Sequence, residues 1–491
     1  RQPWPGGGRL AAAHAPRCLR RMQPIFAVFT TLVVAFLYRA FVLLVLERCR
    51  CWGRLPKTVR VSAQYYALFY ALLSLVLGDS LFKTGQLFTE HPWLDRRTFE
   101  RGPDTEAKEL RLPLWLVWLS LGTPVAAIGT FVIGVYHTWK HALAVAKFGG
   151  GLLSESVQRD RTIQVIALPA IFSLMAFNAV MELWFLFTGF VPAADGRRRP
   201  PAASPWGKRL AWTEQSYTAL FAVAGLYEAY ALLIFVWLSL DEVETNLRLT
   251  ASEGDEGRGD GGEEAKLREL PPTGYHMSLM KVLRSLTMQG VLWFVFTCFL
   301  DACYNLFVVN YAQVNNYKLP KWTTGWEEYL YGMAFITSSA AITNVVSVES
   351  SLHHYFGDFR CAPKFLSTKV MVSIAFLQSM AVDLIAGSAE YLTPMQGKLL
   401  YSSLMCYEVL ALSCFHVYAW PEDEPWLQNT EKGRKEARLR WYSATAMFSV
   451  GPRMLAWARR AKARVARRRA QEPRRPASAG SSSPGSPGSA S

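Results

Sequence analysis

The sequence predicts an all-α, polytopic integral membrane protein: a helical bundle with a seven-helix core and two further hydrophobic helices at its N-terminal side. Three observations support this fold class. Hydrophobic residues make up 51% of the 491 residues and charged residues only 19%, whereas an ordinary soluble chain carries about 25% charged residues. The apolar residues gather in blocks long enough to span a bilayer as helices. Trp and Tyr gather at the block ends, as they do at membrane interfaces.

Nine apolar blocks have the length of a membrane-spanning helix. They are rich in Leu, Ala, Phe and Met without a period-two alternation, so helices are favoured over a transmembrane barrel. Trp115 and Trp118 open the third block, and Trp420 and Trp426 follow the last. The blocks are residues 24–46, 62–82, 114–136, 163–187, 217–240, 286–309, 328–348, 370–388 and 399–419.

The segments outside the blocks are polar and of low complexity. The first block follows basic residues as a signal sequence does, but it is long and no A-x-A-like site follows it, so we expect a retained helix. The basic tail is expected to contact anionic lipid rather than nucleic acid. We divide the chain into a basic segment 1–23, two extra helices in 24–88, a core at 114–426 with an acidic disordered loop at about 250–270, a basic amphipathic tail 427–470 and a disordered end 471–491.

The distribution of Lys and Arg predicts the orientation. From the third block onward, one alternate set of segments is richer in basic residues, and such segments stay in the cytoplasm. This places the C-terminus in the cytoplasm, although Gly196 to Pro200 (GRRRP) then falls on the outer side. The basic set is 137–162, 241–285, 349–369 and the tail from 420.

Acidic residues inside the apolar blocks are the first functional candidates. A charged side chain at the centre of a membrane helix costs roughly 2.5–3.5 kcal/mol on insertion scales, so it tends to face the bundle interior and to serve a function. We expect these residues to form a polar seam along a substrate path, the alternative for each being a role in packing alone. The candidates are Glu182, Glu228, Asp301, Asp383 and Glu408, with His416 in the last block.

Other chemistry is poorly represented. Cys49 and Cys51 follow the first block among arginines, which suits palmitoylation or two inert thiols equally. Glu349 and His353 stand four residues apart, but a solvated pair is favoured over a metal site. No nucleophile elbow, P-loop or dinucleotide motif occurs. We therefore predict no enzymatic activity, no metal and no cofactor.

Several segments taken together resemble the organic solute transporter alpha-subunit and transmembrane protein 184 superfamily. Their order and spacing over residues 114–426 carry the resemblance. They are PKFLSTKVMVSIAFLQ (Pro363 to Gln378), LMCYEVLALSCFHVYAWP (Leu404 to Pro421), LYEAYALLIFVWLSL (Leu226 to Leu240), MQGVLWFV (Met288 to Val295) and IQVIALPAIFSLMAF (Ile163 to Phe177).

Three positions depart from the family pattern. Gln164 or a neighbour stands where the family has Arg, Trp293 where it has Gln, and Val409 where it has Met. The first two change polar groups that line a path in the family pattern, so the substrate type is open.

The resemblance implies a seven-span protein of the plasma membrane or of endosomal or vacuolar membranes. It also implies facilitated passage of an amphipathic organic solute or lipid-like molecule, with membrane lipids and a single-span partner subunit or a second copy as partners. Lys364 and Lys369 are candidates for the cytoplasmic mouth of the path. The alternative is a membrane receptor or scaffold that recruits partners or lipid through its cytoplasmic tail.

Overall fold

A computed structural model describes the helical part of the chain. The described residues are 24–44, 59–60, 63, 66–90, 112–148, 157–188, 206–256, 273–314, 325–356, 359–368, 378, 381–382, 384, 392–422, 424 and 427. They all belong to one compact unit, residues 1–432. The predicted basic tail and disordered end lie outside the described residues.

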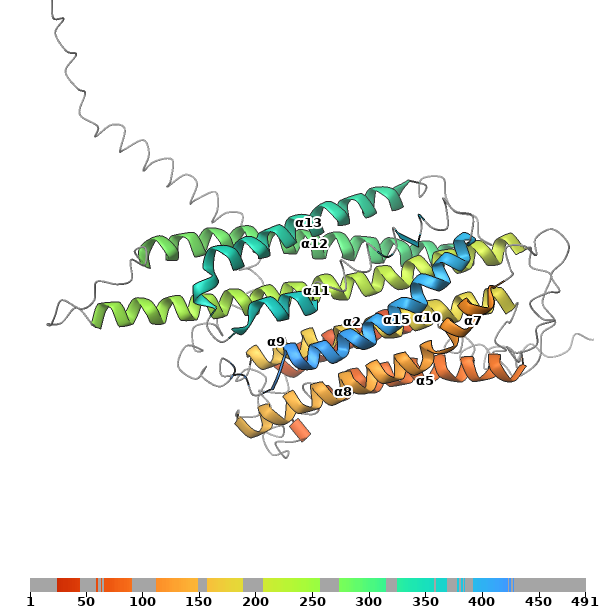
Figure 1. The fold of residues 1–491 in the computed structure, drawn as a ribbon, viewed down its shortest axis with the longest axis horizontal. Coiled ribbons are helices and arrows are strands. Elements are labelled where there is room, and N and C mark those ends of the chain that lie inside the picture. Colours follow the sequence, from red (N-terminus) through yellow and green to blue (C-terminus); the bar gives the residue numbers. More distant parts are fainter. Residues whose placement is uncertain are drawn as a thin grey trace, which may run out of the picture. The chain divides into compact units, whose positions relative to one another are not determined.

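Long α-helices make up this unit, and Figure 1 shows them running side by side. In chain order they are α2 (Pro24–Leu44), α5 (Ala67–Glu90), α7 (Leu114–Leu121), α8 (Thr123–Phe148), α9 (Val157–Ile166), α10 (Leu168–Thr188), α11 (Trp206–Glu256), α12 (Thr273–Val314), α13 (Trp326–Leu352) and α15 (Pro394–Ala419). A 3₁₀ turn, η5 (His353–Tyr355), follows α13, and residues 361–368 are also helical.

The helix α10 lies at the centre of the bundle. All of its residues except Glu182 and Thr188 are buried, and it packs against α5, α8, α11 and α15. Two side-chain hydrogen bonds join it to neighbours: Ser80 Oγ on α5 donates to Asn178 Oδ1 at 2.9 Å, and Trp184 Nε1 donates to Ser120 Oγ on α7 at 3.0 Å. A helix that is apolar on all sides is compatible with such complete burial.

The structure confirms the predicted all-α bundle of membrane-spanning helices, but not the division into a seven-helix core and two extra N-terminal helices. Among the described residues, seven helices are long and apolar enough to cross a membrane, and they coincide with seven of the nine blocks. They are Ala67–Thr89, Leu114–Val145, Gln158–Thr188, Leu210–Leu247, Ser278–Tyr311, Glu328–Tyr355 and Pro394–Ala419. The first block forms α2, which is helical but is not among these seven, and the block 370–388 lies almost wholly outside the described residues.

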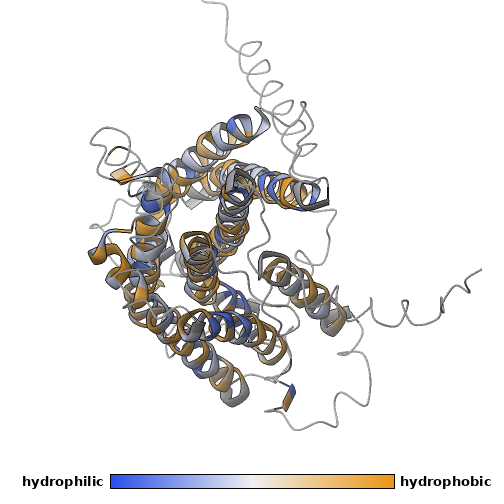
Figure 2. Cartoon of the chain, turned by 90° about the vertical axis from the view of Figure 1, so that its right-hand side faces the viewer, coloured by the Kyte–Doolittle hydropathy of each residue, from blue (hydrophilic) through white to orange (hydrophobic). Residues whose placement is uncertain are grey.

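The bundle exposes large apolar side chains on its outer surface. Figure 2 shows that much of the length of the helices is hydrophobic, and exposed apolar side chains suit a hydrocarbon surrounding rather than water. Examples that are more than half exposed are Leu75, Phe82, Leu114, Val125, Val132, Tyr329 and Ile336. The helix α13, which packs chiefly on α12, has many of its side chains exposed.

Glycines let α8 approach its neighbours closely. A Cβ atom at Gly129 would lie 3.2 Å from Leu410 of α15, and one at Gly134 would lie 3.3 Å from Ala170 of α10. Gly122, at the turn between α7 and α8, faces the phenol of Tyr407, whose hydroxyl donates to the Leu119 carbonyl at 2.6 Å. Small residues at helix contacts are the usual device for tight packing in membranes.

The change Gly122→Ala should destabilise the bundle by about 1–3 kcal/mol, since the added methyl collides with the Tyr407 hydroxyl and breaks its bond to Leu119. Gly332→Ala on α13 is the matched control, because nothing lies within 4 Å of a Cβ there. The measurement is the melting temperature of each purified variant in detergent. Equal melting temperatures for both variants would contradict the close contact.

Candidate functional site

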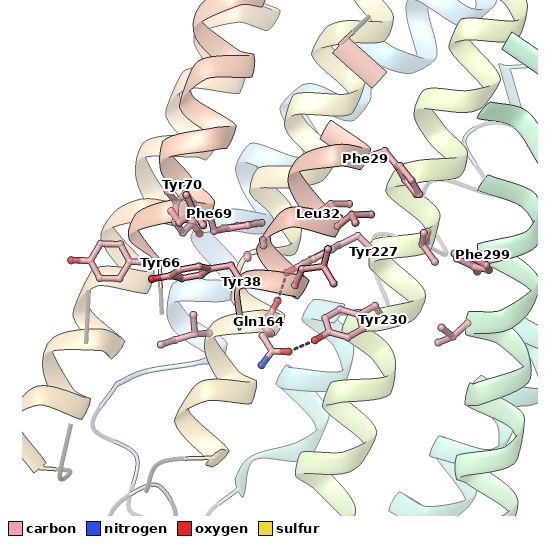
Figure 3. Close-up of a pocket in the computed structure, with 18 of the residues that line it drawn as sticks. Phe29, Leu32, Tyr38, Tyr66, Phe69, Tyr70, Gln164, Tyr227, Tyr230 and Phe299 are labelled. Carbon is pink, nitrogen blue, oxygen red and sulfur yellow. Dashed lines mark hydrogen bonds between the residues drawn. The ribbon is translucent and has the colours of Figure 1, made fainter. Parts of the chain in front are cut away.

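An aromatic cavity of about 360 Å³ lies between the N-terminal helices and the rest of the bundle. Figure 3 shows its aromatic side chains coming from several helices. Apolar groups dominate the wall, as in most small-molecule sites. The lining comprises Phe29, Leu32, Val33, Ala35, Leu37 and Tyr38 of α2; Ala63, Tyr66, Leu68, Phe69 and Tyr70 of α5 and the residues before it; Ile163, Gln164 and Ala167; Leu226, Tyr227 and Tyr230 of α11; and Val295 and Phe299 of α12.

Gln164 is the polar centre of the cavity wall. Its side-chain carbonyl accepts a hydrogen bond from the Tyr230 hydroxyl, and its backbone carbonyl accepts one from the Tyr227 hydroxyl at 2.8 Å (Figure 3). Its amide nitrogen donates to Asp160 Oδ2 at 2.9 Å. The chain of bonds therefore holds Gln164 and both tyrosines in fixed orientations.

A break between α9 and α10 positions Gln164. The helical run is interrupted at Ala167, two residues before Pro169, and proline has no N–H to donate to the preceding turn. Gln164 lies in the last turn of α9, just before this break. On the opposite wall, Tyr70 is fixed to α8 through its hydroxyl, which donates to the Gly134 carbonyl at 3.3 Å and bonds Thr138 Oγ1 at 2.9 Å.

Two of the predicted acidic residues, Glu228 and Asp301, lie on the helices α11 and α12, which both contribute residues to the cavity wall. Glu228 on α11 is buried, and Asp301 on α12 is half-buried and accepts from Asn305 Nδ2 at 3.0 Å. The Cys298 thiol on α12 is within electrostatic range of both carboxylates. None of the predicted seam residues lines the cavity itself.

The structure distributes the other seam candidates over separate places. Glu182 lies on α10 within electrostatic range of Lys83 of α5, which is ion-paired with Asp79 at 2.6 Å. Glu408 lies half-buried on α15, which packs against α10, α8 and α7. Asp383, Lys369, Cys49 and Cys51 lie outside the described residues.

His416 and Lys364 lie in a buried polar cluster where α15 ends, which we name the Lys364 cluster. It consists of Lys364, Ser367, His416, Trp420 and Glu424. His416 Nε2 donates to the Ser367 carbonyl at 3.0 Å, and Trp420 Nε1 donates to Ser367 Oγ at 3.1 Å. His416 is thus a hydrogen-bond donor between segments and is not among the residues that line the cavity.

Lys364 has no exposed surface in this cluster. Its Nζ lies 2.5 Å from Glu424 Oε1 and 2.6 Å from the Phe359 carbonyl, and it faces the rings of Phe359 and Trp420 at 4.8 and 5.4 Å. Burial lowers the pKa of Lys364, and Glu424 opposes that shift. The side chain is therefore sealed inside the protein instead of lying open at a mouth.

Further polar contacts close the same end of the bundle. His137 and His141 of α8 each donate from Nε2 to the Trp420 carbonyl, at 2.8 and 2.9 Å. Arg161 of α9 pairs with Asp241 of α11, which also pairs with Arg284 of α12. The segments that are rich in Lys and Arg, and that the sequence predicts to face the cytoplasm, thus meet at one end of the bundle.

No metal centre is evident in the part of the chain that the structure describes, where no three His, Cys, Asp or Glu side chains form a group able to hold a metal ion. Glu349 and His353 lie 3.7 Å apart, with the histidine ring largely exposed. This matches the solvated pair favoured by their sequence spacing.

The fold and its apolar surface define an integral membrane protein made of packed helices. Residues 210–425 match the model of the organic solute transporter Ostalpha family (Solute_trans_a), which confirms over this segment the family predicted from the sequence. The match supports a membrane transporter-like role. It begins in α11, whereas the motif resemblance extends from residue 114. No curated protein and no solved structure matches the chain.

The change Lys364→Met should cost about 3–5 kcal/mol of stability, because it leaves the Glu424 carboxylate buried without its cation. The double change Lys364→Met with Glu424→Leu should recover most of the loss, since no buried charge is then unpaired. The measurement is the melting temperature of each variant in detergent.

The matched control is the more exposed pair formed by Lys398 and Glu214 at 2.6 Å. Lys398→Met should cost about 0–1 kcal/mol, because solvent screens such pairs. The account of the Lys364 cluster is wrong if the two lysine variants lose the same stability.

Proposed function

We propose that this protein mediates facilitated passage of an amphipathic organic solute or lipid-like molecule through the membrane. The observation that carries the proposal is the aromatic cavity between the N-terminal helices and the core. Its size lies within the range of small-molecule sites, and its wall combines apolar surface with a few fixed polar groups, those of Gln164, Tyr227 and Tyr230. A molecule with an apolar body and one polar end fits that combination.

Passage also requires the bundle to open at the end where α15 terminates. There the ion pairs of Arg161, Asp241, Arg284 and Glu244 join α9 to α11 and α11 to α12. Gln164 lies about one turn beyond Asp160 and Arg161 on α9. Movement of α9 would therefore couple the cavity wall to these ion pairs. The sequence contains no P-loop, so the proposal does not include pumping driven by ATP.

Of the acidic residues predicted to form a polar seam, this proposal gives a role in passage only to Glu228 and Asp301. Glu228 adjoins Tyr227 in the sequence, and Asp301 follows Phe299 by two residues, so both acidic residues lie on the helical segments that carry the cavity wall. We propose that the pair forms a polar step for the solute next to the cavity. Glu408 lies on another helix face and has a packing role in this scheme.

The surroundings of the protein are part of the proposal. The chain resides in the plasma membrane or in endosomal or vacuolar membranes, with its C-terminus in the cytoplasm, as the excess of Lys and Arg in one set of segments supports. A single-span subunit or a second copy accompanies it, as the family resemblance supports.

A scaffold that recruits partners through its tail is the second candidate function. The net charge of +15 owes much to basic residues beyond residue 427, which favours contact with anionic lipid or acidic partners. A scaffold needs this tail and has no use for a lined cavity, so the two functions can be separated by changing one part at a time.

Purified protein in liposomes should let a radiolabelled amphipathic solute equilibrate faster than empty liposomes do, both for a steroid sulfate and for a lipid analogue as alternative solutes. Glu228→Gln should lower the rate at least fivefold, because it removes one carboxyl group of the proposed polar step. Glu408→Gln is the isosteric control and should change the rate less than twofold.

Truncation after Leu427 tests the scaffold. It keeps the Lys364 cluster intact, because Glu424 is the last cluster residue. Transport predicts an unchanged rate for the truncated protein. A wild-type rate no faster than empty liposomes, together with loss of recruitment after truncation, would favour the scaffold.

A further inference from the structure

The chain leaves α15 through a short segment that other helices hold in place. We name it the exit segment, and its described residues are Trp420, Pro421, Glu422, Glu424 and Leu427. Trp420, Glu424 and Leu427 are buried. Besides the Lys364 cluster, which fixes Trp420 and Glu424, the helices α8 and α9 bind the backbone of this segment. The exit segment is therefore built into the end of the bundle.

Two histidines of α8 bind the same backbone oxygen of the exit segment. His137 Nε2 and His141 Nε2 lie 2.8 and 2.9 Å from the Trp420 carbonyl oxygen. Because a carbonyl oxygen only accepts, each neutral ring carries its proton on Nε2 and leaves Nδ1 unprotonated. His141 Nδ1 is buried and has no hydrogen-bond partner among the described residues. It is therefore a basic nitrogen enclosed in the protein.

The groups around these two rings are largely positive. Lys140 and Arg159 lie within electrostatic range of His141, and so does His137. The Glu422 carboxylate is within range of His137, but it is already ion-paired with Lys140 at 3.0 Å. A proton added at His141 Nδ1 would therefore be a buried charge that faces other cations, which is costly.

The other charged groups at this end of the bundle have partners of their own. Lys364 pairs with Glu424, and Arg161 pairs with Asp241. His416 lies within electrostatic range of His137, and its Nε2 is engaged with the Ser367 carbonyl. The two histidines of α8 are thus the groups at this end whose charge changes near neutral pH and that bind the exit segment directly.

The exit segment also binds α9, which carries a polar part of the cavity wall. Arg159 Nη1 on α9 donates to the Glu422 carbonyl at 2.9 Å. The next residue, Asp160, accepts from the Gln164 amide nitrogen at 2.9 Å, and the Gln164 side chain accepts from the Tyr230 hydroxyl. One short helix and its hydrogen bonds therefore connect the exit segment with the cavity.

We propose that the exit segment is a proton-sensitive clasp, which holds α9 in place while His137 and His141 are neutral and releases it when they are protonated. The closed form keeps both rings neutral, whereas the open form exposes them to water and takes up protons. Acid therefore favours the open form, and the closed form is lost as the pH falls through the range in which histidine ordinarily titrates, about 6.5. This inference rests on the proposed function and names a regulation of the same cavity, because release of α9 raises the flux of solute.

Hydrogen–deuterium exchange of residues 420–427 tests the clasp without reference to transport. The sample is the purified full chain in lipid nanodiscs, and the reporting amides are those of Trp420 and Leu427, which donate to the His416 and Glu424 carbonyls. After correction for the intrinsic pH dependence of exchange, protection in the wild type should fall about tenfold from about pH 7.5 to about pH 5.5, the change that one titrating histidine produces. Protection that does not change with pH in the wild type would overturn the inference.

The double change His137→Gln with His141→Gln tests which residues sense the proton. A glutamine amide still donates to the Trp420 carbonyl but takes up no proton, so protection should be the same at both pH values. His141→Gln alone, which disturbs the site less, should remove at least half of the response. His353→Gln is the control, because the ring of His353 is largely exposed, and it should keep the full response. A wild-type response in the double variant would overturn the inference.

Solute flux in liposomes separates this inference from the proposed function. The wild type should carry a steroid sulfate, which stays charged throughout this range, on the order of threefold faster at the acidic pH, within the limit set by one histidine. The double variant should carry it at equal rates. An acid-induced loss of protection without any flux would sustain the clasp and refute transport. Flux with the same pH dependence in the wild type and the double variant would sustain transport and refute the clasp. Melting temperatures of the variants within about 2 °C of wild type at the higher pH show that their altered exchange does not come from unfolding.

Discussion

The complete burial of α10 is the constraint on which the rest of the structure depends. In hydrocarbon a helix satisfies its own backbone, but its side chains still need close packing and partners for their polar atoms. Asn178 and Trp184 obtain theirs from α5 and α7, and glycines let α8 approach α10 and α15. Gln164 and Ala167, next to the break before Pro169, contribute to the cavity wall.

The sequence predicts the bundle well because lipid imposes a simple pattern. Apolar blocks of spanning length locate seven of the described helices. The helix ends are less predictable, because both helices extend beyond their apolar blocks. The helix α12 already begins at Thr273. The helix α11 continues to Glu256, into the segment expected to be an acidic disordered loop. Hydropathy detects only the apolar part of each helix. The polar ends of α11 and α12 are joined by ion pairs, such as those of Arg284 with Asp241 and Glu244.

The site is less predictable, since it is made from ordinary residues on distant segments. Acidic residues are conspicuous in apolar blocks because burying a charge in a membrane is costly, but none of the predicted acidic residues lines the cavity. The wall itself consists of tyrosines and phenylalanines, which look like common interfacial or core residues in a sequence. One signal was present: Gln164 stands at or near a position where the family pattern has Arg, and it lies in the cavity wall. Its partners on α11 could not be inferred from spacing along the chain.

The central claim is that solute passes through the aromatic cavity, and filling that cavity tests it most directly. Ala35 of α2 lines the cavity, and Ala35→Trp puts a bulky ring into it. Val125→Trp, on the exposed face of α8, adds the same ring outside the bundle. The account predicts that Ala35→Trp lowers solute flux into liposomes at least fivefold at an unchanged melting temperature, while Val125→Trp leaves flux unchanged. Full flux with Trp at position 35 would contradict it.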